Sequence, residues 1–296
     1  MFKNNLMFSK VQFRLQFLVL LWGFTGLFGK LVTISSLPMV WFRMSIAAIA
    51  IYIYIKLTKK SFRVSKKHFF QLLLIGGLVG LHWYTFYLSI KVSNVAIALS
   101  TLSLGALFTS IIEPILFKRK VVVSEIVLAL IVSACIVMIF NTSPDYKLGI
   151  IYGVICSFLS ALFSVINSTY MDKIESTNIT LYEMIGGFLA INLLMIGFQP
   201  ETFNEIVNVG WSNFLWLVLL GVVFTAFAQI EAVNLFKYFT PYTILLNVNL
   251  EPVYGIILAS LVFGKSEQMQ PVFYIATAVM ILSIIVNGIL KSKTNK

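Results

Sequence analysis

Residues 148–171 read LGIIYGVICSFLSALFSVINSTYM, a run of 24 residues without a charged side chain. An α-helix of about 20 apolar residues crosses the hydrocarbon core of a bilayer. Nine further apolar stretches of at least 18 residues occur at 12–31, 38–57, 70–90, 94–117, 124–141, 180–198, 212–235, 241–264 and 270–290. Ten such stretches leave too little polar sequence to coat a soluble protein. The sequence therefore predicts an all-α membrane protein with ten transmembrane helices.

The composition agrees with a membrane protein. Charged residues make up 11% of the chain, whereas soluble domains average about 25%. No polar region is long enough to fold separately. The first stretch begins near Lys10 and Arg14, as in a signal peptide, but it is longer than a typical signal h-region and lacks a small-residue cleavage site. We expect it to remain as the first helix.

The basic residues predict the orientation in the membrane. If the amino terminus is cytoplasmic, 17 of the 22 Lys and Arg residues lie in inner segments and Arg43 lies within the second stretch. Four lie on the outer side: Lys30, Lys91, Lys147 and Lys265. This asymmetry follows the positive-inside rule and suits anionic lipid head groups, so we expect no nucleic acid partner. Ten crossings place both termini in the cytoplasm, and we expect a bacterial-type cytoplasmic membrane.

The chain divides into two weakly similar halves, 1–147 and 148–296. Five residues of the first half recur 146 positions later. These pairs are Lys91 and Lys237, Leu99 and Leu245, Leu104 and Leu250, Ile111 and Ile257, and Phe117 and Phe263. The polar turn at 141–145 follows the fifth stretch, and five crossings place the second half upside down in the membrane. Inverted repeats let a carrier exchange inward-open and outward-open states.

Several short motifs resemble those of a known family. They are Trp22–Lys30 (WGFTGLFGK), Trp41–Arg43 (WFR), Trp83–Lys91 (WYTFYLSIK), Glu251–Tyr254 (EPVY) and Phe263–Lys265 (FGK). Over essentially its full length, the chain resembles EamA-type members of the drug/metabolite transporter superfamily. The resemblance implies a ten-helix carrier built from two inverted five-helix repeats, with efflux of amino acids, related metabolites or drugs.

The chain departs from the family pattern in two places. The family often has a glutamate just after the fourth helix of each repeat, where this chain has a basic run that begins at Lys118, and Lys265. Glu125 and Glu267 follow a few residues later. The first-repeat position that matches Pro252 is Ala106.

Glu251 is the leading candidate for the transport pathway, because an ionisable group inside the bilayer needs a partner, a cavity or a function. Helical spacing places Asn247 and Glu251 on one face, with Tyr254 on the same side. Pro252 lacks an amide hydrogen and frees carbonyl groups that face a solute. Pro114, in the fourth stretch, is a second candidate for a kink or gate. Alternatively, Glu251 makes a structural bond and Pro252 only bends the helix.

Other candidates lie on the first three stretches. Arg43 offers a planar fork for a carboxylate or phosphate, or it snorkels to the outer interface. His82, Trp83 and Tyr84 form an amphipathic cluster that lines a cavity or marks the membrane interface. Trp22, beside two glycines, has the same ambiguity.

Remaining polar residues divide by position. Gln229 is a plausible wall residue. Small polar stripes are more typical of helix-packing seams than of solute sites, which we expect for Ser157, Ser160, Ser164 and Asn167. Most of the four glutamates near cytoplasmic helix ends are expected to form interfacial salt bridges, without a choice among them: Glu113, Glu125, Glu183 and Glu231.

Together these patterns predict a secondary transporter of a small organic, amino acid-like metabolite, with export suggested by the resemblance. Proton coupling through Glu251 is a hypothesis, and we expect no cofactor or metal. The alternatives are a multidrug or lipophilic-cation carrier, a membrane enzyme or a sensor. The chain lacks HExxH and Gly-x-Ser-x-Gly motifs, and its longest outer loop, 199–211, is too short for a sensor domain. A monomer and a homodimer both fit.

Overall fold

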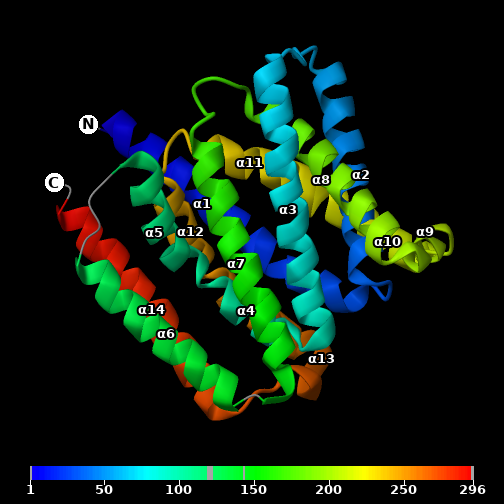
Figure 1. The fold of residues 1–296 in the computed structure, drawn as a ribbon. Helices are drawn as coiled ribbons and strands as arrows, with labels where there is room; N and C mark the ends of the chain where they lie inside the picture. The colour runs from blue at the N-terminus through cyan, green and yellow to red at the C-terminus, as the bar shows by residue number, and fades with distance from the viewer. Residues whose placement is uncertain (1, 119–122, 143, 295–296) are drawn as a thin grey trace.

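The computed structural model describes residues 2–118, 123–142 and 144–294, which form helices joined by turns and short coil (Figure 1). Arg119, Lys120, Ser143, Lys296 and the Glu125 side chain lie outside the described residues. Within the described part, eight helical segments are long and apolar enough to cross a membrane. Two shorter apolar helices, Leu130–Asn141 and Pro271–Ser283, occupy the fifth and tenth predicted stretches. The protein is an integral, multi-pass membrane protein.

The helices follow the predicted stretches closely. Those of the first half are α1 (Phe2–Leu31), α2 (Ser36–Leu57), α3 (Lys66–Val92), α4 (Val95–Leu102), α5 (Gly105–Phe117) and α6 (Val123–Thr142). The short helix η1 (Pro144–Tyr146) follows at the end of the first half. The helices of the second half are α7 (Lys147–Ser168), α8 (Ser176–Phe198), η2 (Pro200–Thr202), α9 (Phe203–Val207), α10 (Trp211–Gly221), η3 (Val222–Phe227), α11 (Ala228–Leu235), α12 (Pro241–Val248), α13 (Glu251–Phe263), η4 (Gly264–Glu267) and α14 (Pro271–Thr294).

Two of the spans are interrupted in the middle. The stretch 94–117 forms α4 and α5, and the stretch 241–264 forms α12 and α13. The interruptions, at 103–104 and 249–250, lie 146 residues apart, which is the offset of the sequence echo. Tight turns close both: the Leu104 amide donates to Thr101 O at 3.1 Å, and the Leu250 amide donates to Asn247 O at 3.0 Å. The offset of 146 residues therefore relates positions in the two halves that share backbone geometry as well as residue identity.

The two interrupted spans run antiparallel to one another. Helix α4 packs against α13, and α5 packs against α12, so the first part of each span meets the last part of the other (Figure 1). Helices α6 and α14 form a further pair between the halves (Figure 1). The halves thus interlock through matching elements.

Glycines bring α3 and α8 into close contact. A Cβ atom on Gly76 would lie 2.8 Å from Glu183 Cα, and one on Gly186 would lie 2.6 Å from Leu73 Cα. Gly80 faces Gly187 in the same seam. Small residues of this kind let transmembrane helix backbones approach closely. Gly76 and Gly80 therefore allow α3 to approach α8 closely.

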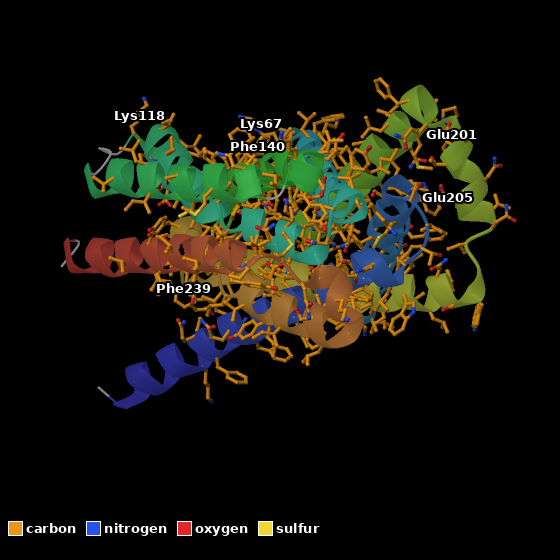
Figure 2. All side chains as sticks on the ribbon, turned by 90° about the horizontal axis from the view of Figure 1, so that it is seen from below. Lys67, Lys118, Phe140, Glu201, Glu205 and Phe239 are labelled. Atoms are coloured by element: carbon orange, nitrogen blue, oxygen red, sulfur yellow. The ribbon has the colours of Figure 1, made fainter. Side chains whose placement is uncertain are left out.

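The loop 199–211 lies far from the end of α5. Figure 2 shows Lys118 on one side of the molecule and Glu201 and Glu205 on the other. Glu205 lies in α9, within the loop 199–211, and its carboxylate accepts hydrogen bonds from the Ser35 amide at 2.6 Å and the Ser35 hydroxyl at 2.8 Å. This loop is therefore partly helical and is bonded to the start of α2.

Candidate functional site

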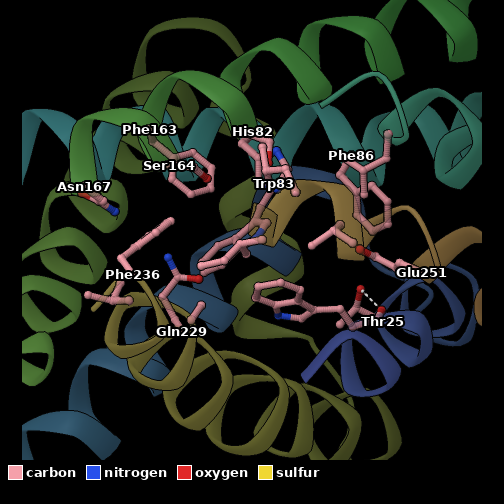
Figure 3. A pocket seen from close by; sticks show the side chains of 18 of the residues that line it. Thr25, His82, Trp83, Phe86, Phe163, Ser164, Asn167, Gln229, Phe236 and Glu251 are labelled. Atoms are coloured by element: carbon pink, nitrogen blue, oxygen red, sulfur yellow. Dashed lines mark hydrogen bonds between the residues drawn. The ribbon is translucent and has the colours of Figure 1, made fainter. Parts of the chain in front are cut away.

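A cavity lies between the two halves (Figure 3). It contains about 720 Å³ of space that protein atoms do not fill, part of it continuous with the outside. Helices α1 to α4 form its wall on one side, and α7 and α11 to α13 form the wall on the other. The lining residues are Trp22, Thr25, Arg43, His82, Trp83, Phe86, Leu102, Ser160, Phe163, Ser164, Asn167, Gln229, Ala232, Val233, Phe236, Ile244, Leu245, Val248 and Glu251.

The cavity brings together most of the residues that the sequence predicts for the pathway. Trp22, Arg43, His82, Trp83, Gln229 and Glu251 all line it. Tyr84, Asn247 and Tyr254 lie outside its lining, although each is at least partly buried.

Asn247 lies outside the lining because the helix is interrupted after Val248. Helical spacing predicts one polar face through Asn247 and Glu251, but the turn at 249–250 separates them into α12 and α13. The Asn247 side-chain oxygen instead accepts hydrogen bonds from Gln16 Nε2 at 2.6 Å and Gln12 Nε2 at 3.3 Å. The prediction of a continuous polar stripe along this span is wrong.

The two prolines occupy different settings. Pro252 is buried in the first turn of α13, directly after Glu251, where a missing amide hydrogen costs no helical bond. The matching interruption in the first half has Ala106 at this position, so proline is not required for it. Pro114 lies within α5, which continues to Phe117. The interruption of that span therefore lies away from Pro114.

Arg43 is held on the cavity wall by three side chains from two helices, α3 and η3. Its Nε donates to Thr225 Oγ1 and its Nη1 donates to the Tyr87 hydroxyl, both at 2.7 Å. The guanidinium carbon lies 3.8 Å from the centre of the Trp83 ring, within range for a cation–π interaction. Because the side chain is only 2% exposed and bonds inward, the snorkelling alternative is wrong.

A π-helix positions one of these partners. Helix η3 lies between α10 and α11, and within it Thr225 Oγ1 donates to Leu220 O at 2.7 Å while it accepts from Arg43. Single π-helical turns often occur at functional sites. Hydropathy does not distinguish this turn from an ordinary helix, so the sequence analysis missed it.

Glu251 presents its carboxylate to the cavity. The residue is 4% exposed, and its carboxylate makes no hydrogen bond or ion pair with the residues that the structure describes. Arg43 is the charged group that interacts with it electrostatically. The cavity is therefore lined by one basic and one acidic side chain, on α2 and α13.

His82 is fixed by the second half of the chain. Its Nδ1 lies 2.9 Å from Cys156 O, and its ring packs edge-on against Phe163. Because a carbonyl only accepts, Nδ1 carries the hydrogen and Nε2 remains an acceptor. Within the described residues, no group of three His, Cys, Asp or Glu side chains is arranged to hold a metal ion.

The α7 stripe divides between packing and cavity. Ser157 Oγ donates to Leu102 O at 2.9 Å, which joins α7 to α4. Ser160, Ser164 and Asn167 line the cavity. The prediction of a helix-packing seam therefore describes only Ser157. Serine is suited both to a contact between helices and to the wall of a cavity, so the sequence does not separate the two.

The comparisons with known proteins bear on the whole chain. The model of the EamA-like transporter family matches residues 15–141 and 147–289. A search of curated proteins found no match. A solved structure titled "Crystal structure of protein" is 17% identical, with a TM-score of 0.70 over 95% of this chain and 98% of that chain. At this identity the similarity shows the fold alone. The family match covers most of the sequence in two consecutive parts, and the chain belongs to the EamA-like transporter family.

Proposed function

We propose that this protein is a secondary transporter that moves a small, amino acid-like metabolite across the cytoplasmic membrane by alternating access. The observation that carries the proposal is the cavity between the halves, lined by both Arg43 and Glu251. We take the direction to be export, as the family resemblance suggests.

The arrangement of the halves supports alternating access. The interrupted spans are antiparallel and pack through matching parts, as expected for inverted repeats. We propose ten crossings with both termini in the cytoplasm, at the end of the bundle that carries Lys118. Two inverted repeats reach inward-open and outward-open states by exchanging conformations around a central site.

The two charges suit a zwitterion. Two N–H groups of Arg43 are held by Thr225 and Tyr87, and a guanidinium has five. The others remain for a solute carboxylate, while the Glu251 carboxylate is oriented toward a solute ammonium group. Trp22, Phe163 and Phe236 supply an apolar wall for the solute side chain. A large apolar amino acid satisfies all three groups.

A lipophilic cation fits the same wall less well. Aromatic rings and Glu251 attract cations, but the buried Arg43 guanidinium repels them and occupies the face of Trp83. The zwitterion is therefore the preferred solute. The two remaining alternatives give different results when solute flux is measured in sealed vesicles. A membrane enzyme would form a product from the solute, and a sensor would show no flux of the solute.

Proton coupling through Glu251 is part of the proposal. Burial away from water disfavours a charged carboxylate, and access to water in an open state restores it. Glu251→Gln should therefore weaken the pH dependence of transport. Normal pH dependence in this variant would eliminate the role of Glu251 in coupling.

Counterflow in proteoliposomes tests the transport function. Vesicles loaded with unlabelled phenylalanine should show transient, saturable accumulation of labelled phenylalanine, whereas labelled tetraphenylphosphonium should not accumulate. Replacing Arg43 by Gln removes charge-assisted bonds to the solute, which are worth about 1.5–3 kcal/mol, or roughly 10- to 100-fold in affinity. Glu201→Gln, on the loop 199–211, is the matched control. Counterflow of tetraphenylphosphonium without counterflow of phenylalanine would support the multidrug alternative instead.

A further inference from the structure

Glu183 is a second buried carboxylate beside the cavity. It lies in α8, its residue exposure is 0%, and neither carboxylate oxygen has a hydrogen-bond partner. The side chains of Asn167 and Gln229, which line the cavity, lie next to it. Glu183 is therefore not one of the expected interfacial salt-bridge partners, since none of the described cations pairs with it.

The Asn167 amide is also unsatisfied. Both its Oδ1 and its Nδ2 are buried without a hydrogen-bond partner. Buried polar atoms are nearly always bonded in native proteins, so such a group calls for an explanation such as an ion, a water or a functional role. The two Glu183 oxygens and the two Asn167 atoms are four such groups on adjacent side chains.

The helices around Glu183 supply no counter-charge. Helices α2, α3 and α11 and the turn η2 pack against α8, yet no charged group on them interacts electrostatically with the carboxylate. Each of the charged or titratable groups nearest the cavity on these helices has another partner. Arg43 bonds Thr225 and Tyr87, His82 bonds Cys156, Glu231 pairs with Arg14, and Tyr182 on α8 itself donates to Phe62 O.

Close helix packing surrounds Glu183 at its backbone. The Gly76 backbone in α3 touches the Glu183 backbone, with no room for a side chain between them. On the carboxyl side, the neighbouring Asn167 and Gln229 side chains line the cavity. Asn167 and Glu251 lie at opposite ends of the cavity (Figure 3), so the two carboxyl groups are distinct sites.

We propose that Glu183 is a second proton-binding site of this carrier, at the end of the cavity marked by Asn167 and Gln229. This inference rests on the proposed transport function. In the closed state the carboxyl group holds its proton, because an isolated buried carboxylate is costly. When that end opens, the O–H bond breaks, the proton passes to water, and the electron pair stays on the carboxylate. The amides of Asn167 and Gln229 then donate hydrogen bonds to the charged form.

Infrared difference spectroscopy tests the protonation state without any solute. Wild type and Glu183→Gln, reconstituted in liposomes at neutral pH, should differ by one protonated-carboxyl C=O band. The matched control Glu201→Gln, which removes an exposed carboxylate, should show no such difference. Because no transport is measured, this result is independent of the proposed function. Identical carboxyl bands in wild type and Glu183→Gln would overturn the proposal.

A second experiment separates a proton carrier from a permanently neutral, structural carboxyl group. Proteoliposomes under an imposed pH gradient should concentrate labelled phenylalanine, and Glu183→Gln should lower gradient-driven uptake relative to exchange. Glu183→Asp, which keeps a carboxyl group, should restore part of it. An unchanged ratio in Glu183→Gln would overturn the proposal, and so would a sodium gradient that drives uptake at constant pH.

Discussion

Ala96 and Tyr242 occupy matching positions 146 residues apart, and each donates its backbone N–H to a glutamate of the opposite half. The Ala96 amide donates to Glu267 at 3.1 Å, and the Tyr242 amide donates to Glu113 at 3.3 Å. First-turn amides have no partner within their own helix, and a carboxylate there also complements the helix dipole. The start of each interrupted span is therefore capped from the opposite half.

Removal of one of these caps should destabilise the fold. Glu267 is fully buried and also pairs with Lys30 at 3.0 Å. Glu267→Ala leaves the Ala96 amide and the Lys30 ammonium without this acceptor, at a cost of about 1–3 kcal/mol. We expect the thermal unfolding midpoint in detergent to fall by several degrees, while Glu201→Ala leaves it unchanged. Equal midpoints for the two variants would show that the cap contributes nothing.

The α3–α8 seam predicts opposite effects for two glycines. Gly76→Ala forces a methyl group into the Glu183 backbone, and overpacking of this kind typically costs about 1–3 kcal/mol. Gly197, near the end of α8, has open space around it. Gly197→Ala should keep or raise stability, because alanine favours helix by about 1 kcal/mol. Thermal unfolding of both variants checks this, and a harmless Gly76→Ala would refute the close contact.

An ion pair links α1 to α11. The Arg14 guanidinium bonds both oxygens of the Glu231 carboxylate, at 2.5 Å and 2.9 Å. Both side chains are partly exposed, so we expect the stability effect of removing either to be small. Arg14→Glu or Glu231→Arg alone should reduce counterflow by like-charge repulsion, and the double swap should recover part of it. No recovery in the swap would show that the residues act separately.

Tyr87 should position Arg43 for the solute. Tyr87→Phe removes one acceptor of the guanidinium without a large change in volume, so the fork loses its fixed orientation. We expect a higher KM for phenylalanine counterflow, by roughly 5- to 10-fold for the loss of about 1 kcal/mol or slightly more. Tyr84→Phe is the matched control, because Tyr84 lies outside the cavity lining. Equal KM values for the two variants would contradict this role of Tyr87.

Sequence reasoning located the helices well, because the hydrocarbon core requires long apolar stretches wherever the chain crosses it. It missed the interruptions and the π-helix, since a one-turn change in backbone bonding leaves hydropathy unaltered. The interruption at 103–104 is a clear case: no proline marks it, and only the weak echo with Leu250 relates it to the second half.

The cavity was predictable only in part. Arg43 and Glu251 stand out because charge in the bilayer is costly. Asn247 was misplaced because helical spacing assumes an unbroken helix. For Ser164 and Asn167, the sequence contains no signal that separates a cavity wall from a helix-packing seam. Glu183 was assigned to the membrane interface because composition alone does not show how deeply a side chain is buried.

The most direct test of the central claim, two halves of opposite orientation around one cavity, is cysteine labelling in sealed right-side-out vesicles. Single cysteines at Asp145 and Lys265 should react with an impermeant maleimide from outside, in a background without Cys135 and Cys156. Cysteines at Lys118 and Lys173 should react only after the membrane is permeabilised. Reaction of the Asp145 and Lys173 positions from the same side would contradict the inverted arrangement and the transport mechanism built on it.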